Sequence, residues 1–395
     1  MIRILTAAAL LFCASFHLAA QTEMIVIDKQ ARSSNPTLRF DGLSGDAQVN
    51  QIVRNNLILC GWFDVVRSNN TDYVISGKAS GNSVTLRIAN SAGQEIATVT
   101  ANGSNAGETA RRGVDRVLKE LFNIPGICQS RIVFTVETGR SRKEIAVCNF
   151  DGTDLKVLTK NRTLSIDPVW TPDGKTVIYS YFGPSYTHLV QIDTTSGLSR
   201  RITRYSGINA GGAVSPDGKK VAMILNLDNQ VDLYVRDLEG GSLRRLTRDK
   251  AVEASPCWSP DGKQICFVSD ATGRPNLYLV NPTGGRSRRI PGLAGSEKVA
   301  PDWSADNKIS YSAKIGRDYV VAVVDMASGT PRMMTSAANA SPVAGEGPSW
   351  APDNRHTAVE NNGKIYIVDT WLGKKRALFQ GRTRAGQPDW STLLK

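Results

Sequence analysis

The sequence contains few of the residues that enzymes most often use for catalysis. Its 395 residues include three histidines, at positions 17, 188 and 356, and six scattered cysteines. No Gly-x-Ser-x-Gly segment, which would carry a hydrolase nucleophile, occurs, and no cysteines and histidines stand at the spacing of metal ligands. We therefore expect no catalytic residue, no metal and no cofactor, and we interpret His188 and His356 as surface or packing residues.

The cysteines also argue against a disulfide scaffold, because the five that follow the first twenty residues are an odd and scattered set. Cys257 and Cys266 are the exception, since counting outward from the turn between them places them opposite each other on paired strands. A bridge can form there if the pair is of the non-hydrogen-bonded kind. The alternative, two small buried apolar side chains, is the interpretation that we favour.

Long apolar runs are equally scarce, and the one that exists lies at the N-terminus. The segment MIRILTAAALLFCASFHLAAQ has an early cation at Arg3, an apolar stretch over residues 4–16, and small residues at Ala19 and Ala20. This pattern predicts a secretory signal peptide over residues 1–20, which is too short to span a bilayer about 30 Å thick. No later stretch is apolar enough for a transmembrane helix, so we expect a soluble exported protein.

Negative charge is in deficit, and the formal net charge is +12. Lysine and arginine are spread along the chain in short pairs such as Arg200-Arg201 and Arg288-Arg289. Scattered positive charge suits solubility and anionic surroundings such as cell-wall polymer. We expect no nucleic-acid partner, because such a role would contradict export.

A hairpin signature, seen in WSPDGKQICFVSD at residues 258–270, recurs along the chain. Copies aligned on the aspartate of the turn follow one another every 44 to 47 residues, at Asp173, Asp217, Asp261, Asp306 and Asp353. Proline, aspartate and glycine supply the backbone angles and local hydrogen bonds of a tight turn. Asn307 and Asn354 replace the glycine, and asparagine tolerates left-handed backbone. The aspartates are therefore predicted to form turns, and the recurring tryptophan to pack between repeats.

Each period contains four short strand patterns, which is the content of one propeller blade. Five motifs are complete, and the chain ends on a sixth first strand, GQPDWSTLLK. The strands that this sixth blade lacks lie upstream, in RIVFTVETG, KEIAVCNFDG and LKVLTK. Pairing the C-terminal strand with them closes the ring and removes open sheet edges. The sequence thus predicts an all-β six-bladed β-propeller over residues 129–395.

The residues before the repeats carry a different pattern. Two stretches with helical spacing flank strand candidates at residues 73–79, 84–89 and 95–100. The two stretches are DAQVNQIVRNNLILCG and ETARRGVDRVLKELFNIPG. They predict a small α+β domain over residues 35–128. The segment between it and the signal peptide, residues 21–34, is expected to be flexible.

Functional residues are expected on the loops that enter the first strand of each blade, because these loops cluster around one mouth of the central channel. The polar residues that we single out there are Asp167, Asn209, Glu253, Ser255, Glu297 and Glu346. A ring of polar groups without an acid-base pair predicts a binding surface.

Several segments resemble the TolB family, the periplasmic propeller proteins of the Tol-Pal cell-envelope system. The segments are EMIVID, IVRNNLILCGWFDVV, YVISGK, RVLKELFNIPGICQSRIVFTVE and QPDWS. The Pro-Asp-Gly repeat alone is shared with prolyl-oligopeptidase-type propellers, so the front domain and the junction carry the specificity. The family's fold is the one predicted above.

The resemblance adds partners. In the family, the lipoprotein Pal docks on the propeller mouth, and the N-terminal segment, packed or released, is recognised by TolA of the inner-membrane complex. By position, the loop residues above would bind a Pal-like lipoprotein. Ser255 and Ile208 depart from the acidic residue and the histidine that are usual there. A TolA-like protein would bind the N-terminal segment, which consists of Gln21, Thr22, Glu23, Met24, Ile25, Val26 and Ile27.

Two functions from different classes follow. The first is a non-enzymatic, monomeric periplasmic adaptor that links Pal with the inner-membrane Tol complex, and so maintains envelope integrity and outer-membrane constriction during division. The second is a secreted propeller that binds or acts on cell-wall glycans or peptides.

Overall fold

The structure, a computed structural model, describes residues 34–336, 341–379, 381 and 383–393. The predicted signal peptide and the segment Gln21–Ile27 lie outside the described residues. Residues Ser33–Lys395 form one compact unit, so the domain boundary at residues 128 and 129 stays a prediction. No helix in the described part of the chain is long and apolar enough to cross a membrane.

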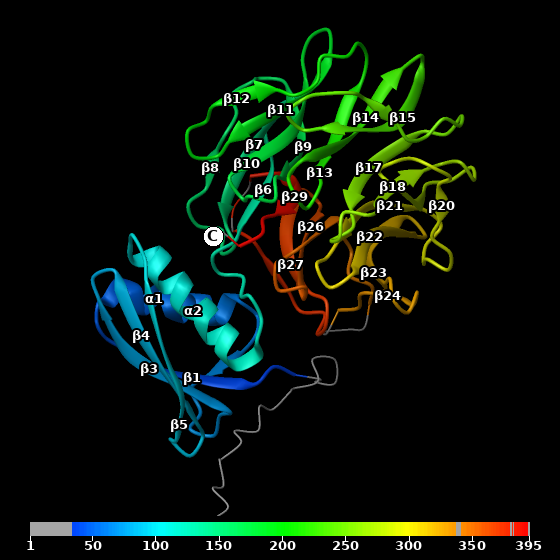
Figure 1. The fold of residues 1–395 in the computed structure, drawn as a ribbon. Coiled ribbons are helices and arrows are strands. Elements are labelled where there is room, and N and C mark those ends of the chain that lie inside the picture. Colours follow the sequence, from blue (N-terminus) through cyan, green and yellow to red (C-terminus); the bar gives the residue numbers. More distant parts are fainter. Residues whose placement is uncertain (1–33, 337–340, 380, 382, 394–395) are drawn as a thin grey trace, which may run out of the picture. The chain divides into compact units, whose positions relative to one another are not determined.

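The N-terminal layer is a five-stranded sheet with two helices (Figure 1). The strand order is β2-β1-β3-β4-β5, with β1 parallel to both of its neighbours. The elements are β1 (Thr37–Gly45), α1 (Ala47–Leu59), β2 (Asp64–Val66), β3 (Tyr73–Ser80), β4 (Ser83–Asn90), β5 (Glu95–Asn102) and α2 (Ala106–Phe122). The predicted α+β pattern is thus present, with two strands, β1 and β2, that the sequence did not indicate.

Polar side chains fix where the two helices begin. Asp46 accepts hydrogen bonds from the backbone of Gln48 and Val49 at the start of α1, and Asn105 accepts one from Glu108 at the start of α2. These caps satisfy amide groups that have no partner inside the helix. The helices therefore start at defined residues and bury apolar stripes against the sheet.

A buried carboxylate orders the junction between α2 and the repeats. Asp115 accepts hydrogen bonds of 2.8–3.1 Å from the backbone of Ile127, Cys128 and Gln129 and from the Gln129 side chain. Only 4 % of Asp115 is exposed, so the ionised carboxylate depends on these four donors for its solvation. The junction is therefore a fixed connection in the described structure.

The remaining strands fall into groups of four, each an antiparallel set, which follow one another along the chain (Figure 1). Group 1 is β6 (Arg131–Gly139), β7 (Arg142–Asn149), β8 (Lys156–Val157) and the C-terminal β29 (Ala385–Trp390). Group 2 is β9 (Leu164–Trp170), β10 (Thr176–Phe182), β11 (Thr187–Asp193) and β12 (Ser199–Arg201). Group 3 is β13 (Asn209–Val214), β14 (Lys220–Leu227), β15 (Gln230–Asp237) and β16 (Arg244–Arg245).

Group 4 is β17 (Glu253–Trp258), β18 (Ile265–Ser269), β19 (Asn276–Val280) and β20 (Arg288–Arg289). Group 5 is β21 (Lys298–Trp303), β22 (Lys308–Ile315), β23 (Asp318–Asp325) and β24 (Pro331–Met333). Group 6 is β25 (Glu346–Trp350), β26 (His356–Asn361), β27 (Lys364–Asp369) and β28 (Lys375–Ala377). Groups 1 and 2 are joined into one eight-stranded sheet by a single parallel bridge between Lys143 and Leu164.

The core lies between neighbouring groups, not within them. On β18, Ile265 and Phe267 belong to a cluster shared with group 3, whereas Cys266 and Val268 belong to one shared with group 5. Alternate residues of a strand point to opposite faces, so each sheet is buried on both sides. Trp258 is 7 % exposed and packs between groups 3 and 4, as expected for the recurring tryptophan.

The repeated turns have the predicted chemistry. Asp261 accepts hydrogen bonds from the Ser259 hydroxyl and from the backbone of Lys263, and the equivalent aspartates at 173 and 217 do the same. The residue that follows is left-handed in each repeat, including Asn307 at φ 67° and Asn354 at φ 56°. Between the strands of this hairpin, Cys257 pairs in register with Cys266, and both are free thiols.

A basic residue on the outermost strand reaches from one group to the next. The Arg200 guanidinium, for example, donates two hydrogen bonds to the Glu239 carboxylate, and the Arg376 guanidinium donates to the Phe150 carbonyl. The other bonds of this kind are Lys156 to Thr194 O, Arg244 to Thr283 O and Arg332 to Thr370 O. Part of the positive charge therefore has a structural role.

Replacement of the junction carboxylate tests its role. Asp115→Asn should lower the free energy of unfolding by about 2 kcal/mol, because an amide cannot accept from all four donors and leaves buried N–H groups unpaired. Urea denaturation at pH 7.5 measures the change. Glu120→Gln, on the exposed side of α2, is the control and should change stability by less than about 0.5 kcal/mol. Equal effects of the two substitutions would contradict the role of Asp115.

Candidate functional site

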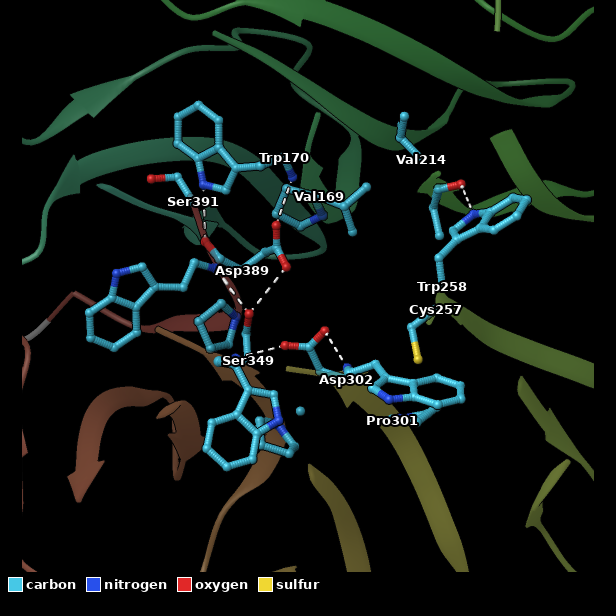
Figure 2. Close-up of a pocket in the computed structure, with 18 of the residues that line it drawn as sticks. Val169, Trp170, Val214, Cys257, Trp258, Pro301, Asp302, Ser349, Asp389 and Ser391 are labelled. Carbon is cyan, nitrogen blue, oxygen red and sulfur yellow. Dashed lines mark hydrogen bonds between the residues drawn. The ribbon is translucent and has the colours of Figure 1, made fainter. Parts of the chain in front are cut away.

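The first strands of the groups line a cavity of about 1570 Å³. Its walls come from β9, β13, β17, β21, β25 and β29, and Figure 2 shows side chains from these segments converging on it. Because strands are antiparallel within a group, the chain enters every first strand at the same end of the cavity. We call this the entry end, and the end with the Pro-Asp-Gly turns the turn end.

Each first strand is bulged at a left-handed residue three positions before its last residue. These residues are Asp167, Gly211, Ser255, Ala300, Gly347 and Gln387, with φ between 46° and 61°. The pairing register shifts at each of them. A left-handed conformation costs a residue with a Cβ about 1 kcal/mol or more, and bulges re-aim side chains beside functional sites. The repetition of this costly geometry around the cavity marks it as the candidate site.

The bulge residues make the cavity asymmetric. Asp167 and Gln387 are paired across adjacent groups, since the Gln387 amide donates to the Asp167 carboxylate. Burial raises the pKa of Asp167. The other bulge residues are small, namely Gly211, Ser255, Ala300 and Gly347. One side of the cavity is therefore closed by a polar pair, while the other is left open.

Glu253 lies beside Ser255 on the open side. It is 1 % exposed; its Oε1 accepts a hydrogen bond from the Ser269 hydroxyl at 3.1 Å, and its Oε2 has no partner in the described structure. Burial raises the pKa of Glu253 to about 8, and the negative charges of Asp249, Asp232 and Asp270 act in the same direction. The entry end thus holds a carboxyl group whose pKa is raised well above that of an ordinary glutamate.

Two further carboxylates face each other from group 6. Glu346 on β25 pairs in register with Glu360 on β26, and both line the cavity. Burial and then repulsion from Glu360 raise the pKa of Glu346. This end of the cavity is consequently acidic and favours a partner that brings hydrogen-bond donors or positive charge.

Deeper in the cavity, polar side chains connect neighbouring groups (Figure 2). The backbone of Trp170 donates to Asp389 at 2.7 Å, that of Trp350 donates to Asp302 at 2.7 Å, and that of Trp390 donates to the Ser349 hydroxyl at 3.0 Å. Burial and then the charge of Asp302 raise the pKa of Asp389 to about 8. These side chains hold neighbouring strand groups together, so we assign them to the scaffold of the cavity.

The cavity contains only part of the residue set singled out from the sequence. Asp167, Glu253, Ser255 and Glu346 line it. Asn209 does not, because it is fully buried and its amide donates to the carbonyls of Tyr205 and Gly207.

Glu297 also lies off the cavity lining. Its carboxylate accepts hydrogen bonds from Lys314 at 2.8 Å and Tyr319 at 2.6 Å. These bonds lower the pKa of Glu297. Asn209 and Glu297 therefore hold the loops that carry the site.

Sequence reasoning missed Gln387, Glu360, Asp302 and Asp389. Gln387 was within reach, because it stands three places before the terminal Trp390, at the same repeat position as Asp167 and Ser255. Glu360 lies on the second strand of its group, so its place in the sequence did not indicate a residue of an entry loop. Within the described residues, no group of three histidine, cysteine or acidic side chains could hold a metal ion.

The pKa of Glu253 predicts a pH dependence of stability. The folded protein keeps a proton that the unfolded chain releases above its ordinary value of 4.5, so this contribution to stability is lost as the pH rises from about 4.5 to about 8. Glu253→Gln should therefore gain stability relative to the wild type as the pH rises through this window. Chemical denaturation at several pH values measures it.

Glu297→Gln serves as the contrasting variant. Because hydrogen bonds lower the pKa of Glu297, its charge stabilises the fold, and the substitution should lose stability above about pH 4.5. If the free energy of unfolding changes with pH in the same way in the wild type and in Glu253→Gln, Glu253 does not hold the proton.

Comparisons with known proteins agree with this architecture. Residues 118–394 match the family model of the TolB beta propeller domain. The Tol-Pal system protein TolB of Desulfosudis oleivorans is 37% identical over 86 residues, covering 20% of this chain and 19% of that protein. TolB of Legionella pneumophila is 26% identical over 196 residues, covering 43% of this chain and 47% of that protein.

The matched stretches therefore span half or less of these curated relatives. In three dimensions, the crystal structure of TolB from Acinetobacter baumannii has a TM-score of 0.80 at 22% identity and covers 91% of this chain and 97% of that one. This likeness establishes a propeller fold with a small N-terminal layer. Together with the family match over residues 118–394, it leads to one conclusion: the chain belongs to the TolB beta-propeller family.

Proposed function

We propose that this protein is a non-enzymatic periplasmic adaptor of a Tol-Pal system. Its entry end binds a Pal-like outer-membrane lipoprotein, and its N-terminal segment, Gln21–Ile27, binds a TolA-like inner-membrane protein. The link maintains envelope integrity and outer-membrane constriction during cell division. The protein acts as a monomer and reaches the periplasm through a signal peptide over residues 1–20.

The observation that carries the proposal is the bulged, acidic entry end of the cavity in a member of this family. A stiff scaffold that repeats a bulge at six equivalent positions, four of them strained because their residues carry a Cβ, presents a prepared surface. Four residues predicted from the sequence to bind Pal, Asp167, Glu253, Ser255 and Glu346, line that cavity. The two others, Asn209 and Glu297, support the loops and contribute indirectly.

We also propose that the strand groups form a six-bladed ring closed by β29. The pairing of β29 with β6 supports closure, because it joins residues 385–390 to residues 132–136. Residues 129–395 would then form the propeller and residues 35–128 the N-terminal domain. The apolar cluster shared by group 6, group 1 and the N-terminal layer supports transmission of force between the two.

The second candidate is a secreted propeller that binds or acts on cell-wall glycans or peptides. The acidic pair of Glu346 and Glu360 favours it, since paired carboxyl groups can act on glycosidic bonds. Turnover of cell-wall fragments by the wild type that disappears in Glu346→Gln would establish this function in place of the adaptor.

A charge placed at the entry end tests the docking surface. Ser255→Lys introduces a long, positively charged side chain at a lining residue close to Glu253 and should weaken binding of the organism's own Pal-like lipoprotein by about tenfold or more. Titration calorimetry with the full-length protein measures the affinity. Leu198→Lys adds the same charge at the turn end, where Leu198 is 76% exposed, and should leave affinity unchanged. Unaltered binding by Ser255→Lys would place the docking surface elsewhere.

Removal of the N-terminal segment tests the second partner. A mature chain without Gln21–Ile27 should fail to bind the TolA-like protein, because the contact residues are gone, and should keep the same unfolding midpoint. Surface plasmon resonance and thermal denaturation measure the two properties. TolA-like binding at wild-type affinity would refute the assignment of this segment.

A further inference from the structure

A basic residue stands at one repeat position in every strand group. The residues recur at intervals of 44, at Lys156, Arg200, Arg244, Arg288, Arg332 and Arg376. Each occupies the outermost strand and the same register place, so that Arg244 lies opposite Val235 and Arg288 lies opposite Leu279. Five of the six donate hydrogen bonds to the following group, so the position has a structural task.

Arg288 is the exception. Its side chain is exposed and makes no hydrogen bond or ion pair in the described part of the chain. The acceptor is the Glu239 carboxylate for Arg200 and a main-chain carbonyl for the other four residues, such as Thr283 O for Arg244. Ala327, which stands where Glu239 stands in group 3, adds no side-chain acceptor, and the described residues show no bond from the Arg288 guanidinium to a main-chain carbonyl of group 5 either. The guanidinium of Arg288 is therefore left without the partner that the repeat provides elsewhere.

Further cations surround this free guanidinium. The side chains of Arg286 and Arg289 are also exposed and make no hydrogen bond or ion pair among the described residues. Lys298 lies on the first strand of group 5. Burial lowers the pKa of Lys298, and the positive charge of nearby Arg289 lowers it further. Repulsion among uncompensated cations is relieved when an anion binds.

The junction beneath these arginines lacks an inner polar connection as well. Cys257 stands directly before the last residue of its first strand, as Asp302, Ser349 and Asp389 do in theirs. It accepts no hydrogen bond from the backbone of Trp303 in the next group. The Trp303 backbone donates instead to the carboxylate of the neighbouring Asp302. Groups 4 and 5 are held by their apolar cluster and by a backbone bond from Lys298 to Pro275. Val169 and Ala213 are likewise apolar at this position in groups 2 and 3, but the junctions that follow those groups keep the outer arginine bond. The junction between groups 4 and 5 lacks both connections.

The outer edge of β20 offers main-chain groups beside the arginines. Ile290 donates inward to Leu277, so alternation along the strand turns the main-chain N–H and C=O of Arg289 toward the open edge. An extended chain can pair with such an edge, and arginine binds carboxylates through two parallel hydrogen bonds. The charges are spread along a strand, which fits acidic side chains spaced along a polypeptide better than one small anion.

We propose that β20, with Arg286, Arg288 and Arg289, is a docking site for an extended acidic polypeptide segment. The segment lies along the edge of group 4 and supplies carboxylates to arginine side chains that have no acceptor among the described residues. This surface is separate from the entry end and does not depend on the function proposed above.

Binding of a labelled deca-glutamate peptide to the full-length protein tests the site. Fluorescence anisotropy at low ionic strength measures the affinity. The triple variant R286Q/R288Q/R289Q should bind at least about tenfold more weakly. The control R201Q/R204Q/R248Q removes the same charge from exposed arginines of groups 2 and 3 and should change the affinity less than about twofold. Equal weakening in both triple variants, or no binding by the wild type, would overturn the proposal.

A second variant keeps all three arginines. Ala327→Glu places a carboxylate where Glu239 stands in group 3, so it should pair with Arg288 and weaken peptide binding at least about fivefold without lowering the unfolding midpoint. Wild-type affinity in this variant would contradict the role of Arg288. Displacement of the peptide by inorganic phosphate, beyond the effect of chloride at equal ionic strength, would show a small-anion site and refute the polypeptide assignment.

Discussion

Apolar packing between neighbouring strand groups is the interaction on which the rest of the structure depends. Every residue of β18 is buried, with alternate side chains in the clusters shared with group 3 and group 5. Because both faces of each sheet are apolar, no group can be stable without a neighbour on either side. Polar bonds are added to this packing, at the turns, at the outer strands and around Ser349, and they fix the register of one group against the next.

The same constraint explains the site. The regular pairing of each first strand breaks at a left-handed residue beside the cavity, such as Ser255 or Gln387, and the break re-aims the neighbouring side chains. A cavity built in this way carries backbone strain that the surrounding cores must hold in place. Its entry end combines Glu253, whose pKa is raised, the acidic pair of Glu346 and Glu360, and small residues at the bulges.

Features that local chemistry determines could be predicted from the sequence. The turn at Asp261, the left-handed Asn307 and the strands of each repeat follow from residues close together in the chain. β1 could not be predicted, because TLRFDGLSG has no clear alternation and its strand forms by parallel pairing with β3. The site was found in part: Asp167 and Glu253 line the cavity, but nothing local shows that Asn209 turns inward or that Glu360 joins from another strand. Arg288 was visible only as a member of a pair, and its missing acceptor is a property of the packed groups.

We have proposed that an outer-membrane partner docks at the entry end of the cavity. Hydrogen–deuterium exchange of the full-length protein, with and without the Pal-like lipoprotein of the same organism, tests this proposal. We expect protection of residues 253–256, 346–348 and 385–388, with the turns at residues 172–175 and 260–263 unaffected. Protection confined to those turns or to the sheet of the N-terminal layer would contradict it.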